Sequence, residues 1–239
     1  MSRVLGLITA RGGSKRLPGK NIKDFLGKPL LAWSIETGQA SGVFDRFVLS
    51  TDNEEIAEVG KRYGIEVPFL RPKELASDTS SSLDAVRHAY EWLRESGFDA
   101  DHIILLEPPA PGRQPFHIQE AAKIIERDDI DSLLAVAELP SQFHPEKVVQ
   151  KKGDLVIRYH EGKAIRESAK RSQEYSTLYF PNASLYAFKS VNFYQDPPSL
   201  WGERVFGYVM DRKYSFDIDT PEDWDAAKLH MRALLEGHA

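Results

Sequence analysis

The sequence predicts an α/β protein in which a mostly parallel sheet is flanked by helices. Short apolar runs rich in β-branched and aromatic residues alternate with longer segments of helical period, a pattern typical of parallel sheets. The first apolar run leads directly into a loop of glycines and basic residues, at the position where α/β sheets bind ligands. The chain has 239 residues, of which 41% are hydrophobic, so it can bury a sizeable core.

The first half of the chain alternates strand and helix. Residues 3–9 form the first predicted strand, and residues 29–40 form a helix with Pro29 in its first turn. The elements predicted after these are a strand at 45–51, a helix at 52–64, an edge strand at 66–72, a capped helix at 80–97, a buried strand at 101–108, a helix at 116–129 and a strand at 130–139.

The pattern changes near Ser141. Residues 144–159 predict a small hairpin, and residues 160–178 are polar without a clear period. We interpret residues 141–178 as a small insertion that serves as a lid or an oligomerisation arm, because its aromatic and charged residues argue against a disordered insert. The core domain then comprises residues 1–140 and 179–239. Its last elements are strands at 183–189 and 206–210, and a strand near residue 215 that runs into a final helix.

Composition excludes several classes of function. The net charge of -5 and the pI near 5.8 argue against a general nucleic-acid binder. Because the chain has no cysteine, disulfides, thiolate metal sites and cysteine nucleophiles are excluded, which fits a reducing cytoplasm. The apolar stretch near the N-terminus is far too short to span a bilayer, so we interpret it as a core strand and expect a cytoplasmic protein without a membrane segment.

The loop after the first strand predicts an anion site. Residues 8–21 read ITARGGSKRLPGKN, and residues 11–28 carry six basic side chains. Glycines let backbone N–H groups approach a ligand closely, and with arginine and lysine they form a concavity for phosphate oxygens. A solvated surface turn is the alternative. The P-loop and dinucleotide-binding patterns are both absent, but the position at the end of the first strand favours a phosphate role.

The segment SFDIDTPEDW, at residues 215–224, predicts a second, acidic site. On a strand, Phe216 and Ile218 would share one face, and Asp217 and Asp219 the other. Helix capping by Thr220 explains the acids that follow it, but not Asp217. Two carboxylates so close together favour a hard divalent cation such as magnesium. A basic loop and an acidic pair at the same sheet suggest a nucleoside triphosphate.

With the segment between them, these motifs resemble the acylneuraminate cytidylyltransferases, the family that makes CMP-activated sialic acids and related nonulosonates. The family has motifs similar to ARGGSKRLPGKN, RPKELASDTSSSLDAV and FDIDTPED in this order and spacing. The resemblance spans nearly the whole chain. It implies a Rossmann-like nucleotidyltransferase sheet, Mg²⁺ as cofactor, and transfer of CMP from CTP to the anomeric hydroxyl of a sialic-acid-like sugar acid with release of pyrophosphate.

The resemblance also implies roles for individual residues at the nucleotide. The expected triphosphate and nucleotide contacts are Arg11, Gly12, Gly13, Ser14, Lys20 and Asn21. Arg71, Ser82 and the backbone near Ser80 would read cytosine, although alone they would be interpreted as a turn and a helix cap. Asp217 and Asp219 would bind the magnesium ion.

The residues that the resemblance places at the sugar are less securely matched. They are Glu107, Lys147, Arg171, Gln173, Tyr179, Phe180 and Asn182, and a core role is the alternative for Tyr179 and Phe180. Glu107 stands where the family usually has glutamine, so a carboxylate acceptor replaces an amide near an anionic sugar. The activity class is unaffected by this departure, but the particular sugar acid stays open. The family also uses the insertion to pack against a partner, so we expect a homodimer, in which Lys147 or Arg171 could reach the neighbour's site.

The expected chemistry depends on charge. Attack on the α-phosphate requires neutralisation of the triphosphate and stabilisation of the departing pyrophosphate, which we assign to Arg11, Lys20 and magnesium. A metal-bound hydroxyl or a carboxylate such as Asp217 could accept the proton of the sugar hydroxyl. Two other classes stay open, namely a nucleotidyltransferase for UTP or GTP with a neutral sugar phosphate, and a non-catalytic nucleotide-binding module.

Overall fold

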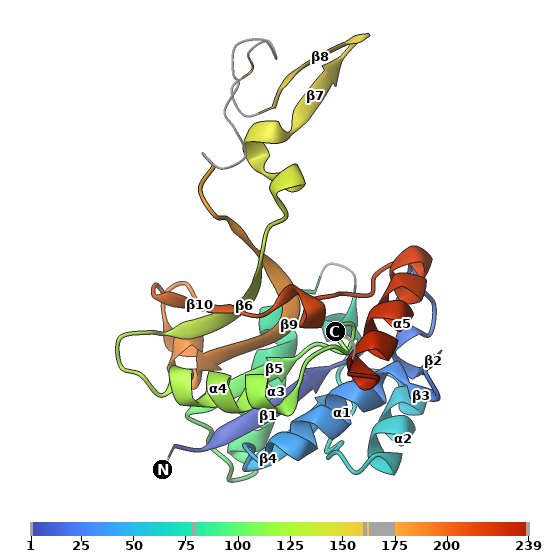
Figure 1. The fold of residues 1–239 in the computed structure, drawn as a ribbon. Helices are drawn as coiled ribbons and strands as arrows, with labels where there is room; N and C mark the ends of the chain where they lie inside the picture. The colour runs from blue at the N-terminus through green and yellow to red at the C-terminus, as the bar shows by residue number, and fades with distance from the viewer. Residues whose placement is uncertain (1, 78–79, 160–161, 163–174, 238–239) are drawn as a thin grey trace.

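The computed structural model describes residues 2–77, 80–159, 162 and 175–237, and a six-stranded sheet forms its centre (Figure 1). The strands follow the spatial order β4-β1-β5-β9-β6-β10. Their bounds are β1 Val4–Thr9, β4 Arg46–Ser50, β5 His102–Leu106, β6 Ser132–Glu138, β9 Tyr179–Lys189 and β10 Val205–Val209. Only β9 runs antiparallel to its neighbours β5 and β6, so the predicted mostly parallel sheet is confirmed.

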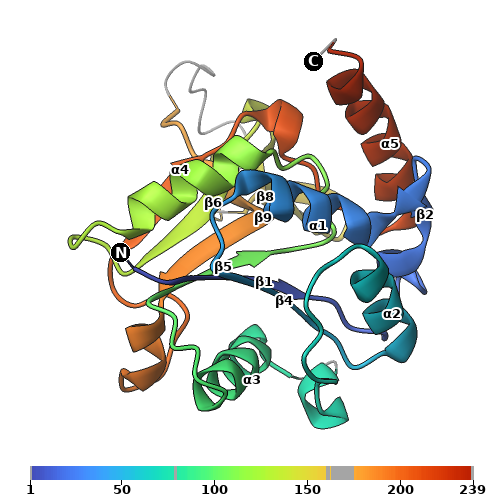
Figure 2. The ribbon, with the colours of Figure 1, turned by 90° about the horizontal axis from the view of Figure 1, so that it is seen from below.

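Helices cover both faces of this sheet, which gives three layers (Figure 2). On one face lie α1 (Leu30–Ser41), α2 (Glu54–Arg62) and α4 (Pro115–Ile125), and on the other lies α3 (Ser82–Glu95). Each face buries its own apolar cluster. The final helix, α5 (Pro221–Leu235), packs instead on the segment after β1, which includes the short strands β2 (Asp24–Phe25) and β3 (Lys28–Pro29).

The strand order places β1 at a topological switch point. From β1 the chain passes through α1 to β4 on one side, and it later passes through α3 to β5 on the other side. The carboxyl ends of β1, β4 and β5 therefore meet at one edge of the sheet, with helices diverging above and below. A crevice at such an edge is where open α/β sheets bind ligands.

Two predicted strands are absent from the described residues. Residues 66–72 make only one bridge, between Val48 and Glu66, because Pro68 and Pro72 lack the N–H groups that a ladder needs. Residues 215–219 are likewise not a strand. The N–H of Ile218 bonds the carbonyl of Pro109, and the neighbouring prolines cannot donate in return. Pro29, expected in the first turn of α1, is instead its N-cap residue.

The predicted hairpin is confirmed as β7 (Val149–Lys152) and β8 (Leu155–Arg158), which pair antiparallel through a turn at Gly153. The two strands form a separate sheet that stands away from the core in Figure 1. Between β6 and β9, the chain thus leaves the central sheet and returns to it. In the part of the chain that the structure describes, no helix is both long and apolar enough to cross a membrane.

Candidate active site

Two adjoining hollows open at the carboxyl edge of the sheet. The first, of about 400 Å³, is lined by Thr9, Arg11, Ser14, Lys15, Arg16, Leu17, Lys20, Asn21, Glu107, Pro108, Pro109 and Asp219. The second, of about 300 Å³, is lined by Thr9, Arg11, Arg71, Leu75, Ala76, Ser77, Ser80, Ser81, Ser82, Ala85 and Glu107. Thr9, Arg11 and Glu107 line both, so the two hollows meet between the ends of β1 and β5. Their volumes are those of small-molecule sites.

The loop after β1 is held open by its own polar contacts. The side-chain amide of Asn21 donates to the carbonyl of Arg11 at 3.1 Å, which ties the end of the loop to its start. A Cβ on Gly12 would lie 3.0 Å from Asn53, so the chain approaches α2 closely at that glycine. The N–H of Gly12 donates to Asp52 at 3.0 Å. Arg11 donates to the carbonyl of Ser77 at 3.2 Å and thereby spans from the first hollow to the second.

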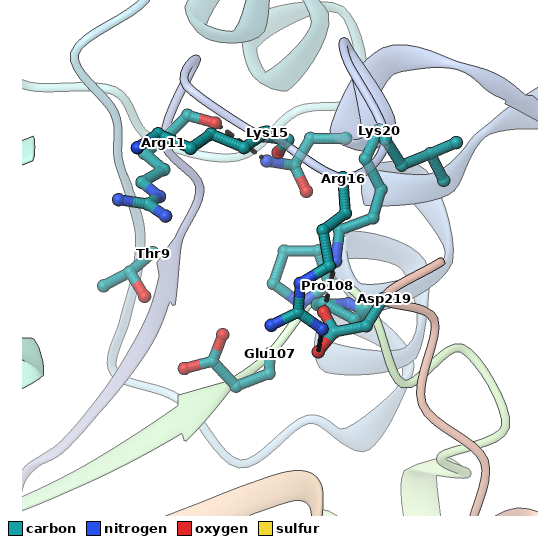
Figure 3. Close-up of a pocket in the computed structure, with 12 residues that line it drawn as sticks. Thr9, Arg11, Lys15, Arg16, Lys20, Glu107, Pro108 and Asp219 are labelled. Atoms are coloured by element: carbon teal, nitrogen blue, oxygen red, sulfur yellow. Dashed lines mark hydrogen bonds and ion pairs between the residues drawn. The ribbon is translucent and has the colours of Figure 1, made fainter. Parts of the chain in front are cut away.

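Lys20 joins this loop to the acidic segment. Its ammonium group is buried and donates to the carbonyl of Ile218 and, at 3.1 Å, to the carboxylate of Asp219. The guanidinium of Arg16 also contacts Asp219, at 3.3 Å, and Figure 3 shows both basic side chains converging on it. The sequence positions of Lys20 and Asp219 are far apart, and the fold brings them together at the wall of the first hollow. At this wall, an anionic ligand would contact two cationic side chains, Lys20 and Arg16, beside one carboxylate, that of Asp219.

Asp217 and Asp219 lie near each other, as predicted, although the backbone there is not a strand. Ile218 is fully buried under α5, whereas Asp217 is exposed and Asp219 half-buried, so the alternation of apolar and acidic side chains is preserved. The surrounding protein removes part of the hydration of Asp217 and, with the neighbouring Asp219 carboxylate, raises its pKa. A cation between the two would offset this repulsion.

The donor set fits magnesium only together with a substrate. No group of three histidine, aspartate or glutamate side chains among the described residues is placed to hold a metal ion by itself. Magnesium is, however, commonly bound by one or two carboxylates together with substrate phosphates and water. Asp217 and Asp219 beside a basic hollow match that pattern, so these residues fit a magnesium–triphosphate complex rather than a metal cage made of protein alone.

The second hollow is built around Arg71, which is buried. Its guanidinium lies 3.8 Å from Asp52, and its backbone N–H bonds the carbonyl of Thr51 at the end of β4. Burial lowers the pKa of Arg71, and the Asp52 carboxylate partly opposes this effect. Asp52 thus joins the glycine loop to Arg71. The arginine is fixed as a donor in a polar hollow, which suits a ligand with carbonyl or ring-nitrogen acceptors.

Three serines close the second hollow at the start of α3. Ser80 donates its hydroxyl to the carbonyl of Glu74 at 2.7 Å, and Ser81 caps the helix by accepting from the N–H of Asp84. Ser82 is the first helical residue. All three line the hollow, as does Arg71, so the structure brings together the residues expected to read the base.

Glu107 and Arg113 are paired through the backbone below the hollows. Arg113 is 1% exposed, and it donates to the main-chain carbonyl of Glu107 at 3.0 Å and to the hydroxyl of Ser34 at 3.2 Å. Burial lowers the pKa of Arg113 to about 9, and Glu107 opposes this effect. Desolvation raises the pKa of Glu107 to about 7, Asp217 adds to the rise, and Arg113 opposes it.

Of the residues expected at the sugar that the structure describes, Glu107 lines both hollows, and Lys147, Tyr179, Phe180 and Asn182 line neither. Asn182 is buried, and its amide donates to the hydroxyl of Ser215 at 2.9 Å, where it supports the acidic segment. Tyr179 and Phe180 begin β9, opposite Glu138 and Ala137. The remaining three lie in the insertion: Lys147 is near Tyr175, and Arg171 and Gln173 fall outside the described residues. Their roles stay predictions.

Sequence reasoning did not assign Arg16, Asp52 or Arg113 to the site. Arg16 is one of the six basic residues between positions 11 and 28, and nothing in its local sequence distinguishes it from a solvated side chain. Asp52 follows the second strand directly, and that position at a strand end is a signal that could have found it. Arg113 offered no such signal, because its buried guanidinium contacts the backbone carbonyl of Glu107 and the hydroxyl of Ser34 on α1, and these contacts depend on tertiary packing.

The fold and these two hollows define an α/β protein with a polar binding site at the carboxyl edge of its sheet. A family model described as cytidylyltransferase matches residues 5–95. The chain is 35% identical to a pseudaminic acid cytidylyltransferase of Campylobacter jejuni strain 81-176, across 94% of each protein. It is 31% identical to the CMP-N,N'-diacetyllegionaminic acid synthase of Legionella pneumophila, across 93% of each. The chain therefore belongs to the cytidylyltransferase family, among the enzymes of the acylneuraminate type.

Further comparisons agree with this placement. The chain is 35% identical to N-acylneuraminate cytidylyltransferase A of Danio rerio, and the match covers 98% of this chain and 52% of that protein. A solved CMP:2-keto-3-deoxy-manno-octonic acid synthetase in complex with CTP has the same fold, with a TM-score of 0.71 and 16% identity over 98% of this chain and all of that one. At this identity, the structural likeness bears on the fold alone.

Proposed function

We propose that this protein transfers CMP from CTP to the anomeric hydroxyl of a nonulosonic acid and releases pyrophosphate. The observation that carries the proposal is the junction of the two hollows. One hollow is basic, and the other is built on Arg71 and the serines at the start of α3. The relatives of the chain include a pseudaminic acid cytidylyltransferase and a CMP-N,N'-diacetyllegionaminic acid synthase. A nucleoside triphosphate laid across this junction would place its base in the second hollow and its phosphates in the first. Its α-phosphorus would then lie between them.

The basic residues supply most of the catalytic effect in this proposal. Arg11 and Lys20 bind the triphosphate and stabilise the charge that develops as pyrophosphate departs, and Arg16 adds a further cation at the same wall. Asp217 and Asp219 would hold a magnesium ion, which when bound supplies additional charge neutralisation at the phosphates. Because Lys20 contacts Asp219, the position of the acidic segment depends on the same lysine.

The nucleotide preference is the direct test of the proposal. Pyrophosphate release is measured with CTP, UTP, GTP and ATP, each offered with a panel of nonulosonic acids and with neutral sugar phosphates. We expect turnover with CTP and a nonulosonic acid only. Turnover with UTP or GTP but not with CTP would assign the chain to another nucleotidyltransferase reaction, and nucleotide binding without any turnover would leave a binding module.

We further infer that two copies of the chain pair through the insertion, in the cytoplasm. The β7–β8 hairpin is a separate two-stranded sheet, and an isolated two-stranded hairpin is marginally stable in water. Several apolar side chains of the insertion are exposed, among them Phe143, Leu155 and Tyr159. A partner would cover these side chains and bring Lys147 toward a neighbouring site.

A further inference from the structure

Asp52 lies where the chain segments that continue β1 and β4 separate, at the carboxyl edge of the sheet. The main-chain pairing of the two segments ends with the N–H of Ala10, which donates to the carbonyl of Ser50 at 3.0 Å. Two residues further along each segment, the N–H of Gly12 donates to the Asp52 carboxylate at 3.0 Å. A side chain thus continues the contact between the segments after their backbone ladder has ended.

The same carboxylate oxygen of Asp52 also faces Arg71. It lies 3.8 Å from the guanidinium, of which only a small part is accessible, because 4% of the Arg71 side chain is exposed. The backbone N–H of Arg71 donates to the carbonyl of Thr51 at 2.7 Å. The main chain and the side chain of Arg71 are therefore both held by the two residues that follow β4, and not by a strand of its own.

The charge of Asp52 matters because Arg71 is surrounded by protein. The Nε of Arg71 is buried and has no hydrogen-bond partner in the part of the chain that the structure describes. Burial lowers the pKa of Arg71, Asp52 opposes this effect most strongly, and the positive charge of Arg11 adds to it. Removing one partner of such a pair leaves an uncompensated buried charge, which is strongly unfavourable. Without the Asp52 charge, we expect Arg71 to turn toward solvent.

The two contacts of Asp52 serve the two different hollows. Arg71 lines the second hollow, where the base would lie. Arg11 and Ser14, on either side of Gly12, line the first hollow, where the phosphates would lie. Asp52 itself lines neither hollow, so it can affect a ligand only through the groups that it holds.

We propose that Asp52 is a positioning residue that couples recognition of the base to binding of the triphosphate. Its carboxylate fixes Arg71 toward the base and, at the same time, fixes Gly12 in the loop that binds the phosphates. The inference rests on the proposed function, because it places the base and the phosphates in these two hollows. A purely structural role, in which Asp52 only holds the loop, would affect the binding of base and phosphates alike.

Two substitutions separate the two contacts. In Asp52→Asn, the charge that faces Arg71 is lost, while a side-chain oxygen can still accept from the N–H of Gly12. In Asp52→Ala, both contacts are lost. Calorimetry gives the dissociation constants of CTP and of tripolyphosphate, each with magnesium. The ratio of the tripolyphosphate constant to the CTP constant isolates the contribution of the nucleoside, because the change in charge at the site affects both anions similarly.

We expect Asp52→Asn to lower this ratio at least about tenfold, because it breaks a buried charge pair at the base. Arg71→Met should lower the ratio as well, and the double variant should match Arg71→Met within about twofold, since Asp52 acts on the base through Arg71. Asp52→Ala should bind tripolyphosphate at least about threefold more weakly than Asp52→Asn, because both variants lack the charge and only asparagine keeps the contact with Gly12.

Asp45→Asn is the matched control. The Asp45 carboxylate also accepts from a backbone N–H, that of Val4 at the amino end of β1, and it lines neither hollow. Its ratio should equal that of the intact protein. Melting temperatures verify the fold of each variant, and Asp52→Leu, which has a similar shape and no acceptor, replaces Asp52→Ala if the alanine variant does not fold.

Three results would each overturn the coupling and leave the proposed function intact. They are a ratio that changes by less than about twofold in Asp52→Asn, a double variant more than about threefold below Arg71→Met, and equal tripolyphosphate affinity in the two Asp52 variants. A ratio near one in the intact protein would overturn the inference as well. The proposed function is judged separately, by pyrophosphate release, which these binding measurements do not require.

Discussion

Lys20 joins the loop after β1 to the acidic segment before α5, through the carbonyl of Ile218 and the carboxylate of Asp219. In the variant Lys20→Met, the buried stem is kept and the charge is lost. We expect kcat to fall on the order of a hundredfold or more, since removing one transition-state contact commonly has that effect. Pyrophosphate release under saturating CTP measures it.

Lys61→Met is the matched control for Lys20→Met. Lys61 lies in the last turn of α2, pairs with Glu58 on the same helix and lines neither hollow. The Lys61→Met variant should release pyrophosphate at the same rate as the intact protein. A near-normal rate for Lys20→Met, in a protein with an unchanged circular dichroism spectrum, would contradict the phosphate role.

A substitution at Asp217 tests the proposed magnesium site, also at the scale of a single residue. The variant Asp217→Asn keeps the shape of the side chain and removes its charge, so we expect the magnesium concentration for half-maximal rate to rise at least about tenfold. Asp225→Asn is the control, because Asp225 is exposed on α5. Magnesium titration of the rate gives the result. Full activity in the presence of a chelator would contradict the proposal outright.

At the scale of elements, α4 contains a buried histidine that makes stability depend on pH. His117 is 2% exposed, its ring accepts from the N–H of Gln114, and burial, followed by Arg113, lowers its pKa to about 4. The folded protein therefore keeps His117 neutral, whereas the unfolded chain takes up a proton near pH 6.5. The contribution of this histidine to stability is complete above pH 6.5 and is lost as the pH falls toward 4.

This predicts a loss on the order of 3 kcal/mol in the free energy of unfolding between pH 6.5 and pH 4 from His117 alone. Urea titrations across this range measure it. His117→Gln should flatten the pH dependence, because glutamine can still accept from the Gln114 N–H and does not titrate. His230→Gln, at an exposed position on α5, should leave it unchanged. If the free energy of unfolding falls equally steeply with decreasing pH in His117→Gln and in the intact protein, His117 is not the cause of the pH dependence.

At the scale of the whole molecule, the proposed pairing through the insertion predicts that one chain alone is not sufficient for activity. None of Lys147, Tyr179 and Phe180 lines a hollow of its own chain. If a partner supplies Lys147, two defective proteins should complement each other. We expect Lys147→Ala and Lys20→Met, each nearly inactive, to regain up to about a quarter of the normal activity when mixed and allowed to exchange subunits.

The control for this mixing experiment is each variant mixed with itself, which should stay inactive. Light scattering at the concentration of the assay gives the mass in parallel. A mass of one chain, or full activity of Lys147→Ala alone, would remove the shared site from the proposal.

The sequence by itself determined the local structure. Apolar periodicity located β1, β5, β6 and the five helices, the Lys152–Asp154 turn located the hairpin, and the pattern from Thr220 to Asp223 encoded the cap of α5, which the structure contains as a reciprocal capping box. These signals lie within a few residues of one another, so they act before any long-range contact forms. The same holds for the glycine-rich loop, whose place at a strand end suggested a ligand.

Only the tertiary structure decided which of these local features meet. Lys20 and Asp219 are separated by 199 positions, and their contact follows from α5 packing on the segment after β1. The acidic segment is a loop rather than a strand because the residues beside it include Pro108 and Pro109, which its own sequence does not reveal. The position of Glu107 between the two hollows likewise follows from β5 lying next to β1. Such contacts depend on strand order, and strand order is set by how all the apolar faces are buried together rather than by any short stretch of the chain.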